Sequence, residues 1–337
     1  MAGMLLALKK AAILDLKNGN LDKAVEKLQK LVRISNVAGL SEATSTVPLW
    51  LILGETYKQK FNYLSAVRVF LSVLEIEPNV SARLQLIELY RVIGQLDNSV
   101  EVARTLEKEG NCPENLKAFF LINYAYSLVL YAQSVQSIEE QKPLFEELFP
   151  LLINLTNDEH SLILQKTLAI ALEIVQSADS DEFPGLCQTL NLPALGINNR
   201  LELIEKRVAA LKIILEGNLT FSDSWNDLAI CLSELATLNG DETMMDKAEK
   251  FMERAILLPS SAQKRSNYYF NLGALKSKRL RLSSAAHFFI RALQLNDQNA
   301  KAWYALSLIY KKVDKIKESH EARLKAQQID PDVVEMA

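Results

Sequence analysis

The chain has 337 residues, of which 49% are hydrophobic, and it contains 11 glycines and nine prolines. So little glycine and proline excludes a loop-rich β protein or a disordered chain, and Leu, Ala, Glu and Lys recurring at helical spacing predict an all-α protein. The formal net charge is −3, but residues 261–326 carry 14 Lys and Arg against four Asp and Glu.

Cysteine usage and hydropathy limit the cellular setting. Three cysteines lie far apart without a Cys-x-x-Cys pair, which fits a reducing compartment and excludes a disulfide framework or a zinc module. Lys9 and Lys10 interrupt the apolar start of the chain, so we expect no secretory signal. No run of about 18 apolar residues occurs, so we expect no transmembrane helix and a location in the cytosol or nucleus.

A first helical unit occupies the start of the chain. Leu8, Ala11 and Ala12 have the spacing of one helical face, and Leu28 and Leu31 have that of a second helix after a tight turn at Asn18-Gly19-Asn20. Residues 35–48 then read as a loop between units.

The next unit carries the most informative pattern. Its spacing is W-x2-L-G-x2-Y, followed by an alanine, by a phenylalanine four residues later and by a proline eight residues after that. The glycine leaves room for a second helix, and the proline ends that helix. The pattern resembles the tetratricopeptide repeat (TPR), a helix-turn-helix unit of about 34 residues. Its residues are Trp50, Leu53, Gly54, Tyr57, Ala66, Phe70 and Pro78.

Similar units recur along the chain. Tyr57 and Tyr90 are 33 residues apart, and further units begin at Trp225, Tyr269 and Trp303, the last two separated by 34 residues. Because one unit cannot bury its own apolar face, this periodicity predicts stacking of neighbours. The partner helix of the Trp225 unit arrives about eight residues late, and we expect a stretched loop at residues 239–241 to account for the delay.

Between residues 114 and 220 the period is lost while helical patterning persists. A polar break at 177–185 interrupts this stretch, and we expect degenerate or expanded repeats on either side. The helices expected here cover residues 119–131, 144–155, 162–175 and 200–216.

The expected fold is therefore an all-α TPR-type solenoid, a right-handed superhelix of antiparallel helix pairs. We expect one array over residues 1–337, with TPR units at 5–113, irregular repeats at 114–220 and TPR units again at 221–334.

No motif indicates chemistry. The sequence lacks nucleotide-binding loops, metal-ligand pairs and nucleophile motifs, so we expect a protein that is not an enzyme, with no catalytic, metal or cofactor residues. His287 lies between two packing residues of a second helix, and we expect it to be buried or half-buried.

The first helices of stacked units line a groove, which is the default binding surface of such an array. Large apolar residues dominate the expected groove, which favours a protein segment or a helix as the ligand. The alternative is that some of these residues pack under neighbouring repeats. No carboxylate clamp is expected, because the matching positions of the first helices carry neither Lys nor Asn. No asparagine ladder is expected either, because Asn271 stands alone. The groove candidates are Leu51, Ile52, Glu55, Phe270, Asn271, Tyr304 and Leu308.

The basic stretch near the C-terminal end predicts a second surface. Clustered Lys and Arg there indicate contact with RNA or an acidic partner, and the alternative is a solvated outer face. The candidates are Lys276, Lys278, Arg279, Arg281, Lys311 and Lys312.

Several segments also resemble the TPR scaffold subunit of the superkiller complex. The resemblance implies a scaffold in cytoplasmic 3′→5′ mRNA decay that holds a DExH-box RNA helicase and WD40 subunits and serves the RNA exosome. Members of that family are much longer, so we expect this chain to be a fragment, a short isoform or the product of a truncated gene model. A generic TPR adaptor in a ubiquitin-ligase or transport assembly is the alternative. The segments are 220–228, the stretched loop, 245–248, 267–275, 299–303 and 328–331.

Overall fold

The computed structural model describes residues 2–37, 47–135, 137–155, 161–178 and 181–334. Among these residues the regular structure is α-helical with short 3-10 segments, and no strand occurs. The chain divides into two compact units, unit 1 (Met1–Asp158) and unit 2 (Glu159–Ala337). The expectation of an all-α fold is confirmed.

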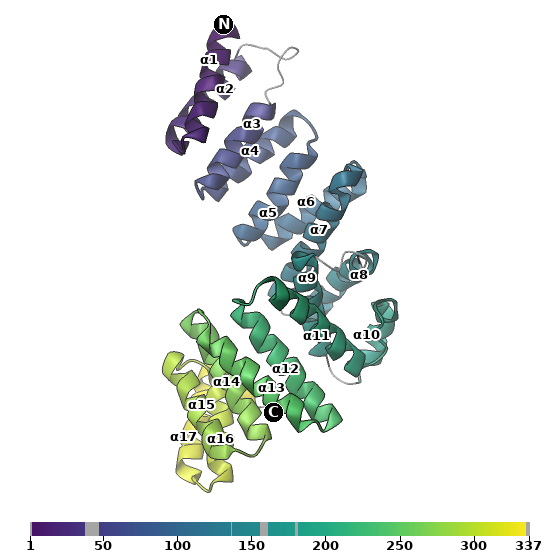
Figure 1. The fold of residues 1–337 in the computed structure, drawn as a ribbon, viewed down its shortest axis with the longest axis vertical. Helices are drawn as coiled ribbons and strands as arrows, with labels where there is room; N and C mark the ends of the chain where they lie inside the picture. Colours follow the sequence, from purple (N-terminus) through teal and green to yellow (C-terminus); the bar gives the residue numbers. More distant parts are fainter. Residues whose placement is uncertain (1, 38–46, 136, 156–160, 179–180, 335–337) are drawn as a thin grey trace. The chain divides into compact units, whose positions relative to one another are not determined.

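Unit 1 consists of helix pairs joined by short turns, and each helix packs on the next in chain order (Figure 1). Helices cover both ends of the loop predicted at 35–48, and its residues 38–46 lie outside the described residues. The helices are α1 (Ala2–Lys17) with α2 (Leu21–Val37), α3 (Val47–Gln59) with α4 (Tyr63–Ile76), α5 (Val80–Val92) with α6 (Leu96–Glu109), and α7 (Glu114–Ser134) with α8 (Ile138–Asn154).

Unit 2 begins irregularly and ends in regular pairs (Figure 1). Its α9 (Leu162–Gln176) packs on α11 (Arg200–Gly217), and α11 packs on α12 (Ser222–Asn239). The remaining elements are α10 (Phe183–Thr189), η1 (Leu192–Leu195), α13 (Glu242–Leu257), α14 (Ala262–Lys278), α15 (Leu282–Leu295), α16 (Ala300–Lys312), α17 (Ile316–Ile329) and η2 (Pro331–Val334).

Polar side chains fix where many helices start. In each case the side-chain oxygen of the residue before the helix accepts a hydrogen bond from a backbone N–H in the first turn, which satisfies a donor that the helix leaves unpaired. At the other end of α4, the helix stops at Ile76 and Pro78 follows, as the sequence predicts. The capping residues are Asn62, Asn79, Ser161, Asn199, Asp241, Ser261 and Asn299.

The interior of each pair is filled by residues of complementary size. A β-carbon on Gly54 of α3 would lie 2.6 Å from Cζ of Phe70 in α4, and Phe70 is fully buried. The same close approach joins Gly273 of α14 to Phe289 of α15, with a closest distance of 2.7 Å. A small residue on the first helix therefore makes room for a ring on the second.

The α5–α6 pair reverses these sizes at the same spacing. Here Ile87 stands at the glycine position and Ala103 at the ring position, and both are fully buried. The large buried residue therefore lies on the first helix in this pair and on the second helix in the α3–α4 pair.

The Trp225 unit differs from the expectation. Its extra residues are not a stretched loop, because α12 continues as helix to Asn239 and Gly240 then ends it in the left-handed conformation with φ 67°. Nothing in residues 233–239 breaks a helix, and buried Leu235 and Ala236 extend the packed face by a turn. A longer first helix therefore delays the partner helix.

The irregular stretch contains the expected helices. Those predicted at 119–131, 144–155, 162–175 and 200–216 correspond to α7, α8, α9 and α11, while α10 begins within the polar break and η1 comes after it. The prediction for His287 is wrong, since the imidazole is exposed and lies at the edge of the Phe288 ring. His287 is two residues from buried Ala285 and Phe289, and this spacing directs it away from the helix face they occupy.

Candidate protein-interaction site

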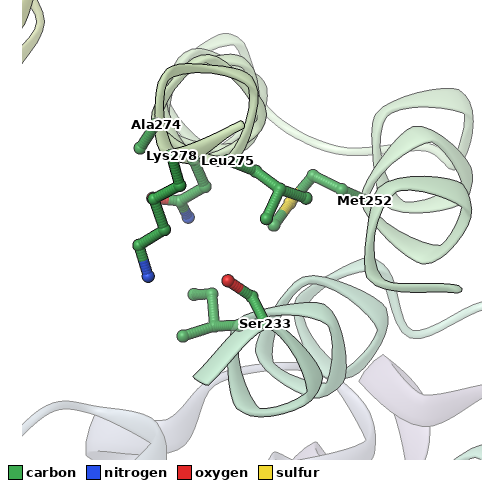
Figure 2. Close-up of a pocket in the computed structure, with 7 residues that line it drawn as sticks. Ser233, Met252, Ala274, Leu275 and Lys278 are labelled. Atoms are coloured by element: carbon green, nitrogen blue, oxygen red, sulfur yellow. The ribbon is translucent and has the colours of Figure 1, made fainter. Parts of the chain in front are cut away.

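A pocket opens between α12 and α14, the first helices of two consecutive pairs (Figure 2). Its volume of 140 Å³ is close to the roughly 150 Å³ of an engineered cavity that holds one benzene molecule, so it matches a single side chain. Cofactor and drug-sized sites take about 300–1,000 Å³. The lining residues are Ile230, Ser233, Met252, Asn271, Ala274, Leu275 and Lys278.

The lining combines an apolar wall with a few polar groups. Figure 2 shows Leu275 and Met252 lying against each other, with the Ser233 hydroxyl directed into the space between the helices and Lys278 extending beside it. Lys278 is exposed and has no ion-pair partner in the part of the chain that the structure describes. An apolar side chain next to an acceptor or carboxylate would satisfy both parts of this lining.

Asn271 is not isolated, contrary to the expectation. Its Nδ2 donates a hydrogen bond of 2.9 Å to Oδ1 of Asn226 on the preceding first helix. This amide pair links α12 to α14 beside the pocket.

The groove candidates of unit 1 are half-buried and packed against the core. Leu51 contacts the cluster that contains Phe70, and Ile52 contacts the cluster that contains Leu28. Glu55, on the same helix α3, is also half-buried. Leu51 and Ile52 therefore stabilise neighbouring pairs, and any contact with a ligand would use only the part of each side chain that stays open.

In unit 2 the groove candidates differ in accessibility. The ring centroid of Phe270 lies 5.7 Å from that of Phe289, inside the α14–α15 pair. Tyr304 packs against a small cluster built on Ala300 and Ala326. Leu308 is 41% exposed and is the most open of the apolar candidates.

Half of the candidate basic patch is paired with carboxylates of the chain. Lys276 and Arg279 keep only 12% and 13% of their side chains exposed, and both pair with Glu249 of α13, at 2.6 and 3.0 Å. Arg279 also pairs with Asp246 and Glu242. We call these residues the α13–α14 ion-pair network, together with Arg281, whose Nη1 lies 3.4 Å from Glu249.

The network has one buried acceptor. Burial alone would raise the pKa of the Glu249 carboxyl, but hydrogen bonds from Lys276 and Arg279 bring that pKa below its ordinary value. The charges of Lys276 and Arg279 therefore hold α14 to α13, and Lys278, Lys311 and Lys312 remain exposed.

A second polar cluster lies where α9, α11 and α12 meet. Arg207 is 4% exposed, pairs with Glu173 at 3.0 Å and donates a 3.0 Å hydrogen bond to Gln176. Burial raises the pKa of nearby Asp227 to about 7, Glu173 adds to the rise and Arg207 opposes it. Burial likewise raises the pKa of the Cys231 thiol to about 12, so this cysteine is a packed and unreactive residue.

The described residues show neither a metal-binding cluster nor a membrane-spanning helix. They contain no group of three or more His, Cys, Asp and Glu side chains placed to hold a metal ion. None of their helices combines the length and the apolar character that a membrane span requires.

Two residues that line the pocket are also candidates from the sequence, Asn271 for the groove and Lys278 for the basic patch. Ile230, Ser233 and Met252 are not among those candidates. A signal was available, because Ile230 follows Trp225 by the same five residues that separate Ala274 from Tyr269. Alignment of the repeats on their aromatic residues places Ile230 and Ala274 at the same position of successive first helices.

Comparisons with known proteins agree with the helix pairs. Residues 47–80 and 300–333 match the tetratricopeptide repeat family model, and these segments contain α3–α4 and α16–α17. No curated protein sequence matches the chain.

Several solved structures are similar to the chain. One is a tetratricopeptide repeat protein from Parabacteroides merdae, with 14% identity and a TM-score of 0.49 over 90% of this chain and 98% of that one. MamA has 16% identity and a TM-score of 0.38 over 60% and 99%. YrrB, described as a TPR protein with an unusual peptide-binding site, has 15% identity and a TM-score of 0.38 over 68% and 92%.

The two family matches and the pairing of the helices together identify tetratricopeptide repeats in this chain. The α3–α4 and α14–α15 pairs share the contact of glycine with a buried ring, and the Trp50 and Trp303 units are those that match the family model. The chain is therefore an all-α protein of the TPR solenoid type, with tetratricopeptide repeats at residues 47–80 and 300–333.

Proposed function

We propose that this chain is a non-catalytic scaffold that holds segments of other proteins. The observation that supports the proposal most directly is the α12–α14 pocket, which is apolar on one side and carries Ser233, Asn271 and Lys278. Its size suits one apolar side chain, and the exposed ammonium of Lys278 suits a carboxylate beside that side chain. The ligand would therefore be an extended or helical segment that carries an apolar residue next to an acidic one.

The finer proposal concerns the assembly. The resemblance of segments such as 220–228 and 267–275 to the superkiller scaffold supports a role in cytoplasmic exosome-mediated 3′→5′ mRNA decay. In that role the chain would hold a DExH-box RNA helicase and WD40 subunits, in the cytoplasm or also in the nucleus. The competing proposal is an adaptor in a ubiquitin-ligase or transport assembly.

Affinity purification of the full chain with mass spectrometry tests both levels. Ala274→Phe places a ring in the pocket, and Ala262→Phe places the same ring at an exposed position of the same helix as a matched control. Thermal melts of both variants verify that each is folded.

Proteins retained by Ala262→Phe and lost by Ala274→Phe would be ligands of the pocket. If these are helicase and exosome subunits, the mRNA-decay proposal is supported, whereas ubiquitin-ligase or transport proteins would favour the adaptor. An identical set of proteins for wild type and both variants would contradict the pocket as the binding site.

A further inference from the structure

The turn between the two helices of a pair has the same backbone in several repeats. The residue that leaves the first helix adopts the left-handed conformation, and the following N–H bonds back to the helix, as Arg281 N does to Lys276 O at 3.0 Å. Glycine occupies this position at Gly19, Gly94 and Gly240. This choice is expected, because a β-carbon in this conformation lies too close to the backbone.

Leu280 departs from that pattern in unit 2, as Asp314 does in the next pair and Phe61 does in unit 1. It follows α14 with φ 56°, and its side chain is 76% exposed. The backbone of this turn disfavours leucine, and the leucine buries little apolar area in return. Neither the turn nor the core therefore explains why a large apolar residue stands there.

Further apolar side chains are exposed at the corresponding turn of the next pair. Val313 ends α16 with 43% of its surface exposed, and Ile316 begins α17 with 63% exposed. Because α14 and α16 are the first helices of consecutive antiparallel pairs and contact each other, the turns that follow them lie at the same end of unit 2.

Unpaired positive charge lies among these apolar residues. Lys311 and Lys312 are exposed in the last turn of α16, and Lys315, in the same turn region, lies over the Tyr310 ring. None of these three lysines forms an ion pair with any residue that the structure describes. The carboxylates nearest in sequence, Asp314 and Glu318, are fewer than the lysines, so the charge here is net positive.

We infer that this turn-edge surface docks an acidic protein segment in which carboxylates alternate with apolar side chains. The surface consists of Leu280, Lys311, Lys312, Val313, Lys315 and Ile316. Aliphatic side chains gain free energy by covering apolar area, and the lysines favour a ligand of opposite charge. Single-stranded RNA is matched less well, because RNA-binding surfaces stack bases on exposed aromatic rings and this surface exposes aliphatic ones.

The inference adds a second contact to the proposed scaffold function, at a surface distinct from the α12–α14 pocket. Binding is measured by fluorescence anisotropy of the full chain with a labelled peptide of repeated Glu-Leu-Asp triplets. The comparison probes are the same peptide with serine for leucine, one with lysine for both acidic residues, and a uridine oligonucleotide of equal length. The triplet peptide should bind in a salt-sensitive manner and the others should bind more weakly.

Three variants locate the binding. Leu280→Gly and Lys311→Glu should each weaken binding by about tenfold or more. Phe61→Gly is the matched control, because Phe61 has the same turn conformation in unit 1 and is 78% exposed, and it should leave binding unchanged. Glycine suits this backbone, so a lower affinity of Leu280→Gly without a lower melting temperature would not be a folding defect.

The inference is overturned by undetectable binding of the triplet peptide, by tighter binding of the oligonucleotide, or by equal affinity of wild type and Leu280→Gly for the triplet peptide. Loss of peptide binding in Ala274→Phe alone would assign the peptide to the pocket, which would support the scaffold function and refute the turn-edge surface.

Discussion

Replacing Gly273 by alanine tests whether the helix pairs depend on a missing side chain. The new β-carbon would lie 2.7 Å from two atoms of the Phe289 ring and 3.3 Å from the carbonyl oxygen of Ala285. Favourable carbon–carbon contacts are about 3.5–4.0 Å, so the ring would have to move by nearly 1 Å. Phe289 is only 2% exposed, and its surroundings leave it little room to do so.

The expected magnitude comes from two opposing effects. Overpacking a core typically costs about 1–3 kcal/mol, and alanine gains about 1 kcal/mol over glycine within a helix. We therefore expect Gly273→Ala to lower the free energy of unfolding by up to about 2 kcal/mol. The same argument applies in unit 1 to Gly54, which faces Phe70 at 2.6 Å.

Two other glycines of unit 2 are matched controls. Gly185 in α10 has no atom within 4 Å of an added β-carbon, so Gly185→Ala should cause no loss of stability. An added β-carbon at Gly217 would meet the Leu162 side chain at 2.7 Å, but Leu162 is 37% exposed and can rotate away. Gly217→Ala should fall between the other two variants.

Urea unfolding followed by circular dichroism, together with hydrogen exchange of α14 and α15, measures these differences. Hydrogen exchange is needed because repeat arrays can unfold in parts. A double-mutant cycle with Phe289→Leu should show favourable coupling, since the smaller side chain makes room for the added methyl group. If Gly273→Ala is as stable as Gly185→Ala, then the glycine contact does not determine the packing of the pair.

Two further predictions concern buried charges in unit 2. Burial disfavours the ionised form of Asp227 and raises its pKa from 3.8 to about 7, so this group lowers the stability of the fold as the pH rises through that interval. Asp227→Asn should therefore raise the free energy of unfolding by up to about 4 kcal/mol at about pH 8. Urea unfolding at several pH values measures this gain. A gain that does not grow with pH would contradict this. Glu249→Gln should lower the free energy of unfolding by about 3–5 kcal/mol in the same assay, because it leaves Lys276 and Arg279 without their shared buried partner. Glu242→Gln removes an exposed carboxylate and should cost at most about 1 kcal/mol. Equal effects of the two substitutions would show that burial does not decide the strength of this network.

The repeat architecture was predictable because its determinants are local and periodic. Trp50, Gly54 and Phe70 specify one helix pair through their spacing, and the spacing recurs at Tyr269, Gly273 and Phe289. The extension of α12 was not predicted, because a delayed second helix has two explanations, a longer loop or a longer helix. Only the contacts of Leu235 and Ala236 with the core decide between them.

The candidate site was harder to predict, because exposure of a side chain depends on contacts that are distant in sequence. Lys276 and Lys278 are two residues apart and identical in chemistry, yet Lys276 pairs with Glu249 on another helix while Lys278 lines the open pocket. The side chains of a helix change direction by about 100° per residue, so two residues separate the face toward α13 from the face toward solvent. A lysine cluster in the sequence therefore predicts a binding surface only for those lysines that form no ion pair between helices. Among the described residues, Lys278 at the pocket and Lys311 and Lys312 at the turn-edge surface form no such pair, and each lies next to apolar residues that the fold leaves open.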